Sequence, residues 1–246
     1  MKKNIEIIAE VGINHGGDMQ IATDLIWQAK RAGADVVKFQ LYDPRKRKDI
    51  EEHPWKEVVL NSRITRRQLY QLKEECDKAN IEFLASCFDV ERVGWCEEIK
   101  VKRYKIASKS VYDKELVDAI LLTNKPVIIS CGMMAEGLPD NIEYENTNLS
   151  FLYCISHYPT MLEELNFYSG VRGTNFFKDD YEGFSDHTLG IAASCVAMSL
   201  GAVIVEKHIT LDKTMDGPDH ICSATIDELR FLCNFRGEVE RILYEN

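Results

Sequence analysis

Short runs of β-branched and aromatic residues alternate along the chain with longer stretches of helical length. The short runs predict strands at residues 5–13, 35–42, 82–87, 103–108, 126–132, 150–155, 183–187 and 203–210. Apolar positions spaced i, i+3, i+4 and i+7 predict helices at 19–34, 65–80, 90–100, 113–124, 190–202 and 225–244. The repeating unit is therefore a strand followed by a helix.

Repeated units of this kind over 246 residues predict an α/β protein with the (β/α)8 TIM-barrel fold. The strand runs are apolar almost throughout, which indicates parallel strands buried on both faces. An open, doubly wound sheet is the alternative architecture. Because the pattern continues without a linker or a low-complexity segment, we expect one domain over residues 1–246.

Two stretches interrupt the helical pattern. Gly137 and Pro139 fall within residues 135–148, and two glycines fall within residues 162–180. We expect the outer helices in these two places to be short or irregular.

Composition narrows the class of protein. Lys and Arg number 30 against 40 Asp and Glu, so the net charge of -10 argues against a nucleic-acid surface, and an anionic ligand needs local cations. The chain shows no signal peptide and no long apolar run, so we expect a cytoplasmic protein without a membrane segment. Its 8 cysteines are irregularly spaced, which favours buried, reduced thiols over a zinc cluster.

Polar residues late in the predicted strands are candidates for chemistry, because a barrel of this type carries its active site at the carboxyl ends of its strands. Lys38 and Lys105 lie between apolar strand residues and can supply positive charge to a phosphate or carboxylate. A lysine that snorkels to solvent is the alternative for Lys38. Ser86, Ser108 and Ser130 each close a strand, either as hydroxyl donors to the same ligand or as turn residues.

Two histidines end the last two predicted strands, which are neighbours in a closed barrel. His187 and His208 can therefore reach one divalent ion that keeps open positions for water and substrate, although buried structural histidines are the alternative. Strand alternation places Ser185 on the face of His187 and Glu206 on the face of His208. Asp186 points the other way, where it can orient or cap.

A carboxylate also interrupts the first strand. Glu10 lies in the apolar run IIAEVGI, and a buried carboxylate needs a partner or a function. It can move a proton or pair with one of the lysines, and the residues leave both roles open. Together these features indicate a metal-assisted enzyme that acts on a small anion.

The same residues belong to longer strings with a recognisable order. These strings are IIAEVGINHGG, GADVVKFQ, YKIASKS, PVIISCGMM, FSDHTLG and VEKHITLDKTMDGPDH. In this order they closely resemble the barrel domain of the sialic acid synthase family, which includes the legionaminate and pseudaminate synthases.

The resemblance implies a (β/α)8 barrel that condenses phosphoenolpyruvate with an aldehyde sugar, commonly an N-acylated aminohexose. The products are a 2-keto-3-deoxy (nonulosonic) acid and inorganic phosphate, released by cleavage of a carbon–oxygen bond. Manganese(II) is the divalent metal that the family usually uses.

The resemblance also implies roles for single residues. It makes His187 and His208 the metal ligands and Glu10 the acid or base. It assigns phosphoenolpyruvate binding to Lys38, Ser86, Lys105, Ser108, Ser130, Ser156 and Ser185, and sugar binding to Gln40, Tyr158 and Asp219. Ser86 stands where the family usually has a threonine, and Ser156 fills a place that is often asparagine or serine.

We expect the chain to depart from the family pattern after the barrel and to lack the C-terminal antifreeze-like domain that the family usually has. Either a separate polypeptide supplies that domain, or the acceptor is a smaller aldehyde that the barrel closes around alone. We expect a homo-oligomer. The alternatives are a synthase of related 3-deoxy-2-keto acids that uses another or a phosphorylated aldose, and a catalytically silent barrel or subunit of a split synthase.

Overall fold

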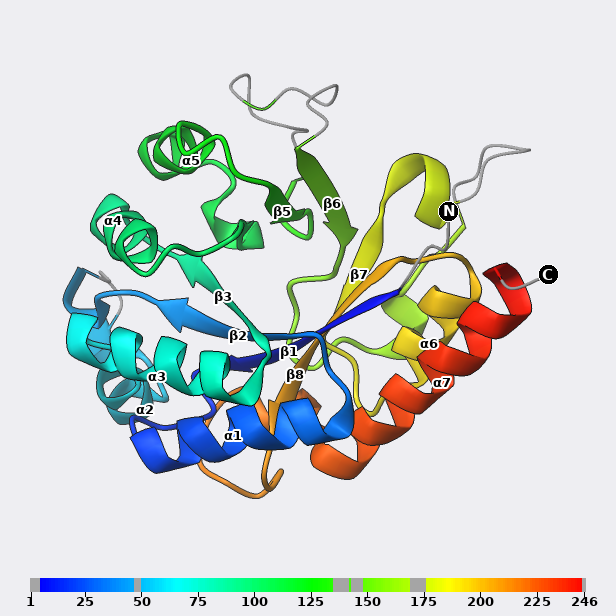
Figure 1. Cartoon of the computed structure of the whole chain (residues 1–246), viewed down its shortest axis with the longest axis horizontal. Helices are drawn as coiled ribbons and strands as arrows, with labels where there is room; N and C mark the ends of the chain where they lie inside the picture. Colours follow the sequence, from blue (N-terminus) through cyan, green and yellow to red (C-terminus); the bar gives the residue numbers. More distant parts are fainter. Residues whose placement is uncertain (1–4, 47–49, 135–141, 143–147, 169–175, 245–246) are drawn as a thin grey trace.

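The computed structural model describes residues 5–46, 50–134, 142, 148–168 and 176–244. Its centre is a ring of parallel strands: β1 (Glu6–Gly12), β2 (Val36–Leu41), β3 (Glu82–Cys87), β4 (Tyr104–Ile106), β5 (Val127–Ser130), β6 (Leu149–Tyr153), β7 (Gly183–Asp186) and β8 (Ile204–Thr210). Each strand pairs with the next, and β1 also pairs with β8, which closes the ring (Figure 1). The predicted barrel is confirmed, and the open sheet is excluded because an open sheet leaves its edge strands unpaired.

Helices form the outer layer around the barrel (Figure 1). They are α1 (Met19–Ala32), α2 (Lys56–Asn61), α3 (Arg66–Ala79), α4 (Val90–Glu98), α5 (Lys114–Leu121), α6 (Ala192–Ser199) and α7 (Ile226–Tyr244). The helix α2 was not predicted, since it is a short turn within the long connection from β2 to α3. The two-residue strand β9 (Ala224–Thr225) also went unpredicted, and it pairs with the end of β8.

The starts of several outer helices follow from local sequence. The side chains of Asp18, Thr65, Asp89 and Asp113 accept hydrogen bonds from backbone N–H groups in the first turns of α1, α3, α4 and α5. Such caps satisfy donors that the helix itself leaves unpaired. They fix where each helix begins relative to the preceding strand.

The expectation of irregular outer structure is confirmed over residues 162–180, as far as the structure describes them. A 3-10 turn at Leu162–Glu164 and a π-helical turn at Phe176–Asp180 occupy the place of a regular helix. The other irregular stretch, residues 135–148, lies outside the described residues except for Ile142 and Asn148.

The barrel interior is layered. A ring of aliphatic side chains fills its lower part, formed by Ile8, Val36, Leu84, Ile128 and Leu152 with the partly buried Ile204. Two residues further along the same strands, the inward side chains become charged, as at Glu10, Lys38 and Glu206. The aliphatic layer thus closes the barrel beneath a polar carboxyl end.

One glycine sets the distance between the last two strands. A Cβ atom on Gly183 would lie 2.0 Å from the backbone oxygen of Ile204, far inside van der Waals contact. The absence of that atom lets β7 approach β8 and brings Ser185 into register with Glu206. This close approach places the polar ends of the two strands side by side.

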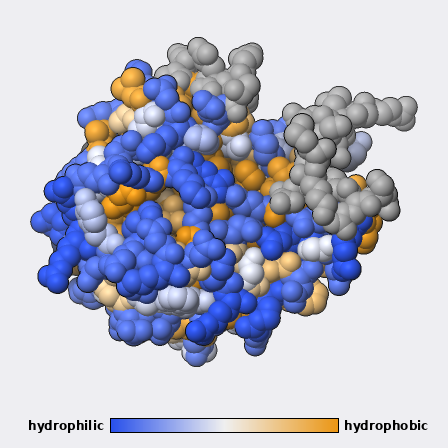
Figure 2. Space-filling model, in the orientation of Figure 1, coloured by the Kyte–Doolittle hydropathy of each residue, from blue (hydrophilic) through white to orange (hydrophobic). Residues whose placement is uncertain are grey.

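The outer surface is mostly hydrophilic on the face drawn in Figure 2, where hydrophobic residues show as separate patches. Among the described residues, no helix combines the length and the hydropathy needed to span a membrane.

Arg103 anchors the amino-terminal end of the barrel, and it supports a test of stability. Its guanidinium binds Glu6 at 2.5 Å and Glu82 at 2.7 Å, so it links the starts of β1 and β3. Arg103→Met should lower the free energy of unfolding by about 1–3 kcal/mol, because both carboxylates lose their shared partner. Urea denaturation measures this change.

Lys102→Met is the matched control, since Lys102 also approaches Glu82 but its side chain is 77% exposed. Its effect should stay within about 0.5 kcal/mol. Equal losses in the two variants would contradict the anchoring role of Arg103.

Candidate active site

Four charged side chains meet inside the barrel directly above the aliphatic layer. The amine of Lys38 lies 3.4 Å from Glu10 and 3.0 Å from Glu206. The amine of Lys105 lies 3.8 Å from the other oxygen of Glu206. All four residues are buried, so we call them the buried charge cluster. Glu206 stands between both lysines and compensates part of their charge.

The two carboxylates of this cluster differ in their proton affinity. Burial raises the pKa of Glu10 to about 7, although Lys38 opposes the shift. Burial acts in the same direction on Glu206, but Lys105 and Lys38 outweigh it and hold the pKa of Glu206 below its usual range. Near neutral pH, Glu206 is therefore the fixed negative charge, and Glu10 is the group that can gain or lose a proton.

Burial also acts on the two lysines, with opposite results. Burial alone would lower the pKa of Lys38, but Glu10 and Glu206 raise it overall. Burial lowers the pKa of Lys105, which has the more distant carboxylate partner. Lys38 is thus the more firmly charged of the two.

Serine hydroxyls at the ends of the strands surround the lysines. Lys38 donates to Ser86 at 3.2 Å, and Lys105 donates to Ser130 at 2.5 Å. Ser108 donates to the backbone oxygen of Ser130 and accepts from the backbone of the β5–β6 connection. Ser185 donates to Glu206 at 2.8 Å. Amines and hydroxyls of this density are suited to a phosphate or carboxylate once the competing carboxylate contacts are given up.

The two predicted histidines lie next to this cluster, with ring centroids 6.0 Å apart. Nδ1 of His187 donates to the backbone oxygen of Ile155 at 2.7 Å, which leaves Nε2 as the basic nitrogen. That Nε2 accepts from the hydroxyl of Tyr158 at 2.8 Å. Nδ1 of His208 is buried and has no hydrogen-bond partner among the described residues.

Both imidazoles are neutral near physiological pH. Burial lowers the pKa of His187 to about 4. Burial and the neighbouring His187 hold the pKa of His208 well below its usual range. Neutral imidazoles are the form that binds metal ions. In the described part of the chain no group of three or more His, Cys, Asp or Glu has metal-binding geometry.

A buried ion pair on the outer side of the barrel links β7 and β8, the two strands that position the histidines. Asp186 and Lys207 are fully buried and lie 3.1 Å apart. Asp186 also accepts from the backbone and hydroxyl of Thr188 and from Ser194, and Lys207 donates to the backbone oxygen of Thr188. Each of these charges is the chain neighbour of a histidine, so the expected orienting role of Asp186 agrees with its contacts.

A cavity of about 380 Å³ opens above the cluster. Its lining includes Ser108, Ser156, Tyr158, His208 and Asp219. Burial raises the pKa of Asp219 to about 6, and its carboxylate lies 4.0 Å from Nδ1 of His208. The lysines themselves lie behind this cavity, since the side chains of Lys38 and Lys105 are only 4% and 2% exposed.

The remaining sugar-site candidate, Gln40, lies at the border between two cavities. Its amide donates to Glu10 at 3.3 Å. A second pocket of about 200 Å³ adjoins the first, and the two share the wall formed by Ile13, Gln40, Val59, Phe88 and Lys109. The structure therefore brings every predicted site residue to the carboxyl end of one barrel.

Two residues of this region had no assigned role in the sequence analysis. Glu206 shares the inward face of His208, so alternation located it, but its distances to the lysines depend on barrel closure. Lys109 follows Ser108 in a 3-10 turn after β4, where no strand alternation indicates direction. Its amine lies 4.4 Å from the centre of the Phe88 ring.

Comparison with known proteins agrees with this geometry. The chain is 36% identical over 266 residues to the N,N'-diacetyllegionaminic acid synthase of Campylobacter jejuni, covering 99% of this chain and 78% of that protein. It is 33% identical over 254 residues to the human N-acetylneuraminate-9-phosphate synthase, covering 96% and 70%.

Among solved structures, the N-acetylneuraminic acid synthetase of Leptospira borgpetersenii, in complex with citrate, superposes with a TM-score of 0.84. It is 31% identical in sequence, and the match covers 99% of this chain and 86% of that one. The model of the NeuB family matches residues 25–245. With its barrel and its sequence in agreement, the chain belongs to the NeuB family of sugar acid synthases.

Proposed function

We propose that this protein condenses phosphoenolpyruvate with the aldehyde of an N-acylated aminohexose, with the help of a divalent metal ion. The products would be a 2-keto-3-deoxy (nonulosonic) acid and inorganic phosphate. The observation that carries the proposal is the juxtaposition of two buried lysines with two neutral histidines at one barrel end. The names of the relatives support the same class of product.

The lysines and serines form the proposed donor site. Lys38 and Lys105 would bind the phosphate and carboxylate of phosphoenolpyruvate, with hydroxyl contacts from Ser86, Ser108, Ser130, Ser156 and Ser185. Glu206 holds both lysines in position before the donor arrives. Binding exchanges part of this internal pairing for charge-assisted contacts to the donor.

The acceptor would lie above the donor, where Gln40, Tyr158 and Asp219 can bind sugar hydroxyls. His187 and His208 would hold the metal ion, most simply manganese(II), because two neutral imidazoles leave open positions for oxygen ligands. When bound, such an ion polarises a carbonyl group and makes its carbon more electrophilic. Tyr158 would then release Nε2 of His187 and donate to substrate.

The reaction forms one carbon–carbon bond and breaks one carbon–oxygen bond. The methylene carbon of phosphoenolpyruvate bonds to the aldehyde carbon, water adds to the carbon that bears the phosphate, and inorganic phosphate leaves. Glu10 can serve both proton transfers in turn. It would give its proton to the former aldehyde oxygen and then accept one from the attacking water, which leaves no net change in its charge.

Phosphate release tests this function directly. The purified chain, supplied with manganese(II) and phosphoenolpyruvate, should release phosphate with at least one N-acylated aminohexose, and the product mass should equal both substrates plus water minus phosphoric acid. His208→Ala should abolish this release and weaken manganese binding, measured by electron paramagnetic resonance, while its circular dichroism spectrum stays unchanged.

Unchanged metal affinity and unchanged turnover in His208→Ala would disprove the metal assignment. Activity of the chain alone would show that a separate antifreeze-like polypeptide is not required. The predicted homo-oligomer is tested in parallel by sedimentation of the same sample.

Lys105 supports a second test, on donor binding. Lys105→Met keeps most of the length of the side chain and removes its charge, so the affinity for phosphoenolpyruvate should fall by about 1.5–3 kcal/mol, on the order of 10- to 150-fold in Kd. Calorimetric titration measures the affinity. Lys102→Met, whose exposed side chain precedes β4, should bind the donor like the parent, and an equal Kd for all three proteins would place Lys105 outside the donor site.

The raised pKa of Glu10 predicts a pH dependence of donor binding. Below about pH 7 the carboxyl of Glu10 is neutral, and Lys38 loses one of its two competing carboxylates. Phosphoenolpyruvate should therefore bind about tenfold more tightly at about pH 6.5 than at about pH 8.5. Glu10→Gln should remove most of this difference, and an identical pH profile in that variant would assign the titration to another group.

A further inference from the structure

The end of the first strand lies against the ring of His208. The register of β1 shifts between Glu10 and Gly12, and Gly12 has a positive φ of 56°. A Cβ atom on Gly12 would lie 3.0 Å from Cε1 and 3.2 Å from Nδ1 of His208. The backbone of Gly12 therefore occupies the space beside the imidazole, in a conformation that glycine adopts without strain.

Asn14, two residues further on, connects this strand end with two other segments. Its buried amide nitrogen donates to the backbone oxygen of Ile209 at 2.8 Å and to the hydroxyl of Ser223 at 2.8 Å. Ile209 is the residue after His208, and Ser223 lies at the end of the connection from β8 to β9. One side chain thus uses both of its donor hydrogens to join β1 to β8 and to the loop that follows β8.

The link continues from Ser223 to a residue assigned to the sugar. The hydroxyl of Ser223 donates to the backbone oxygen of Asp219 at 2.7 Å. The carboxylate of Asp219 lies 4.0 Å from Nδ1 of His208. The hydrogen bonds of Asn14 therefore reach both members of this pair, His208 through the backbone of β8 and Asp219 through the loop.

Packing alone does not account for an amide at position 14. The oxygen of Asn14 is buried and has no hydrogen-bond partner among the described residues. A buried acceptor without a partner costs free energy, which an apolar side chain of similar size would avoid. What the amide adds is its two N–H groups, and both are bound to the segments that carry His208 and Asp219.

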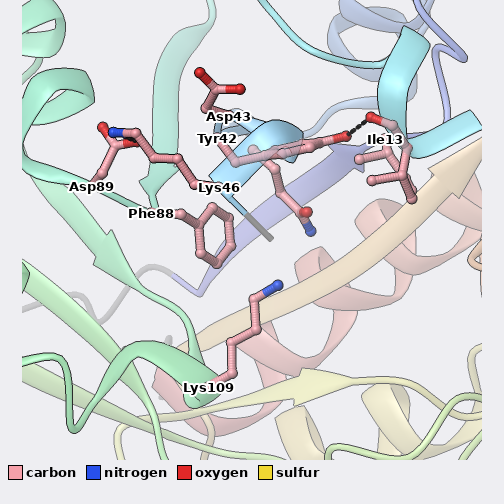
Figure 3. Close-up of a pocket in the computed structure, with 9 residues that line it drawn as sticks. Ile13, Tyr42, Asp43, Lys46, Phe88, Asp89 and Lys109 are labelled. Carbon is pink, nitrogen blue, oxygen red and sulfur yellow. Dashed lines mark hydrogen bonds and ion pairs between the residues drawn. The ribbon is translucent and has the colours of Figure 1, made fainter. Parts of the chain in front are cut away.

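The end of β1 also belongs to the wall of the candidate site. Ile13, between Gly12 and Asn14, lines the cavity above the cluster and the adjoining pocket drawn in Figure 3. Its backbone oxygen accepts from the buried hydroxyl of Ser62 at 3.2 Å. That bond joins the end of β1 to the end of α2, on neither β8 nor its loop, so Ser62 offers a comparison for the bonds of Asn14.

We propose that Asn14 is a positioning residue that holds His208 and Asp219 at a fixed separation, so that one sugar can reach the metal site and Asp219 together. This inference rests on the proposed function, which assigns the metal to His208 and the sugar to Asp219. The lysines of the donor site have their own partners within the buried charge cluster. A change at Asn14 should therefore act on the acceptor and the metal rather than on phosphoenolpyruvate.

Two variants separate the two branches of the link, with N-acetylmannosamine and a 2,4-diacetamido-2,4,6-trideoxyhexose as acceptors. Asn14→Ala removes both bonds, so the KM for the acceptor should rise about 10- to 100-fold and the Kd for manganese(II) about three- to tenfold. Ser223→Ala removes only the branch to Asp219, so the KM for the acceptor should rise about three- to tenfold while manganese affinity stays that of the parent. The KM for phosphoenolpyruvate should stay within about twofold in both variants.

Ser62→Ala is the matched control, because it also removes the hydroxyl of a fully buried serine that donates to a backbone oxygen. Its Tm should fall about as much as that of Ser223→Ala, while its KM for the acceptor stays that of the parent. Equal rises in KM in the two serine variants would overturn the proposal, since a general loss of stability would then explain them. Ser223→Ala keeps this comparison decisive if Asn14→Ala fails to fold.

Hydrogen exchange measures the link in the metal-free protein without turnover. The backbone amides of residues 211–223 should exchange about tenfold faster in Asn14→Ala and Ser223→Ala than in the parent or Ser62→Ala. Parent-like exchange in both variants would overturn the inference. The expected exchange, together with no phosphate release by the parent with either acceptor, would instead contradict the proposed function and support the link.

Discussion

Two lysines inside a barrel are tolerable only because carboxylates lie within ion-pair distance of them. Glu206 contacts both amines, and Glu10 contacts that of Lys38. An isolated buried ammonium would lose its proton or destabilise the fold. The cluster therefore keeps positive charge at a place where an otherwise acidic protein can bind an anion. It also helps to position His208, because Glu206 and His208 share one face of β8.

Strand alternation and the positions of strand ends indicated many of the residues that the candidate site brings together. Alternation predicted that Glu206 and His208 share one face of a strand, and barrel topology predicted that the late-strand lysines and both histidines lie at one end. The ion pairs by which Glu206 compensates the charges of the two lysines were not predictable in the same way. They depend on distances between side chains across the closed barrel. Hydrophobic periodicity likewise identified the long helices but missed α2, where six residues are too few to establish a period.

Residues in the loops after the strands are harder to place from a sequence than residues within the strands. Lys109 lies in a turn, and Asp43 and Asp89 lie just after strands, where side-chain direction depends on the particular loop. Their electrostatic effect depends on the partners that they contact in the folded chain. Arg45 pairs with Asp43, and both Lys46 and Arg92 pair with Asp89, so the charge of this region depends on pairings that form only in the folded chain.

The aliphatic layer beneath the charge cluster has a kinetic consequence. It closes the barrel below the lysines, whereas Tyr158 stands at the mouth with 43% of its surface exposed. In the proposed reaction, a sugar bound at the mouth would lie between solvent and the donor site. In that arrangement phosphoenolpyruvate would have to bind first and the sugar second, so the proposed reaction would follow a compulsory order in which excess acceptor slows the loading of the donor.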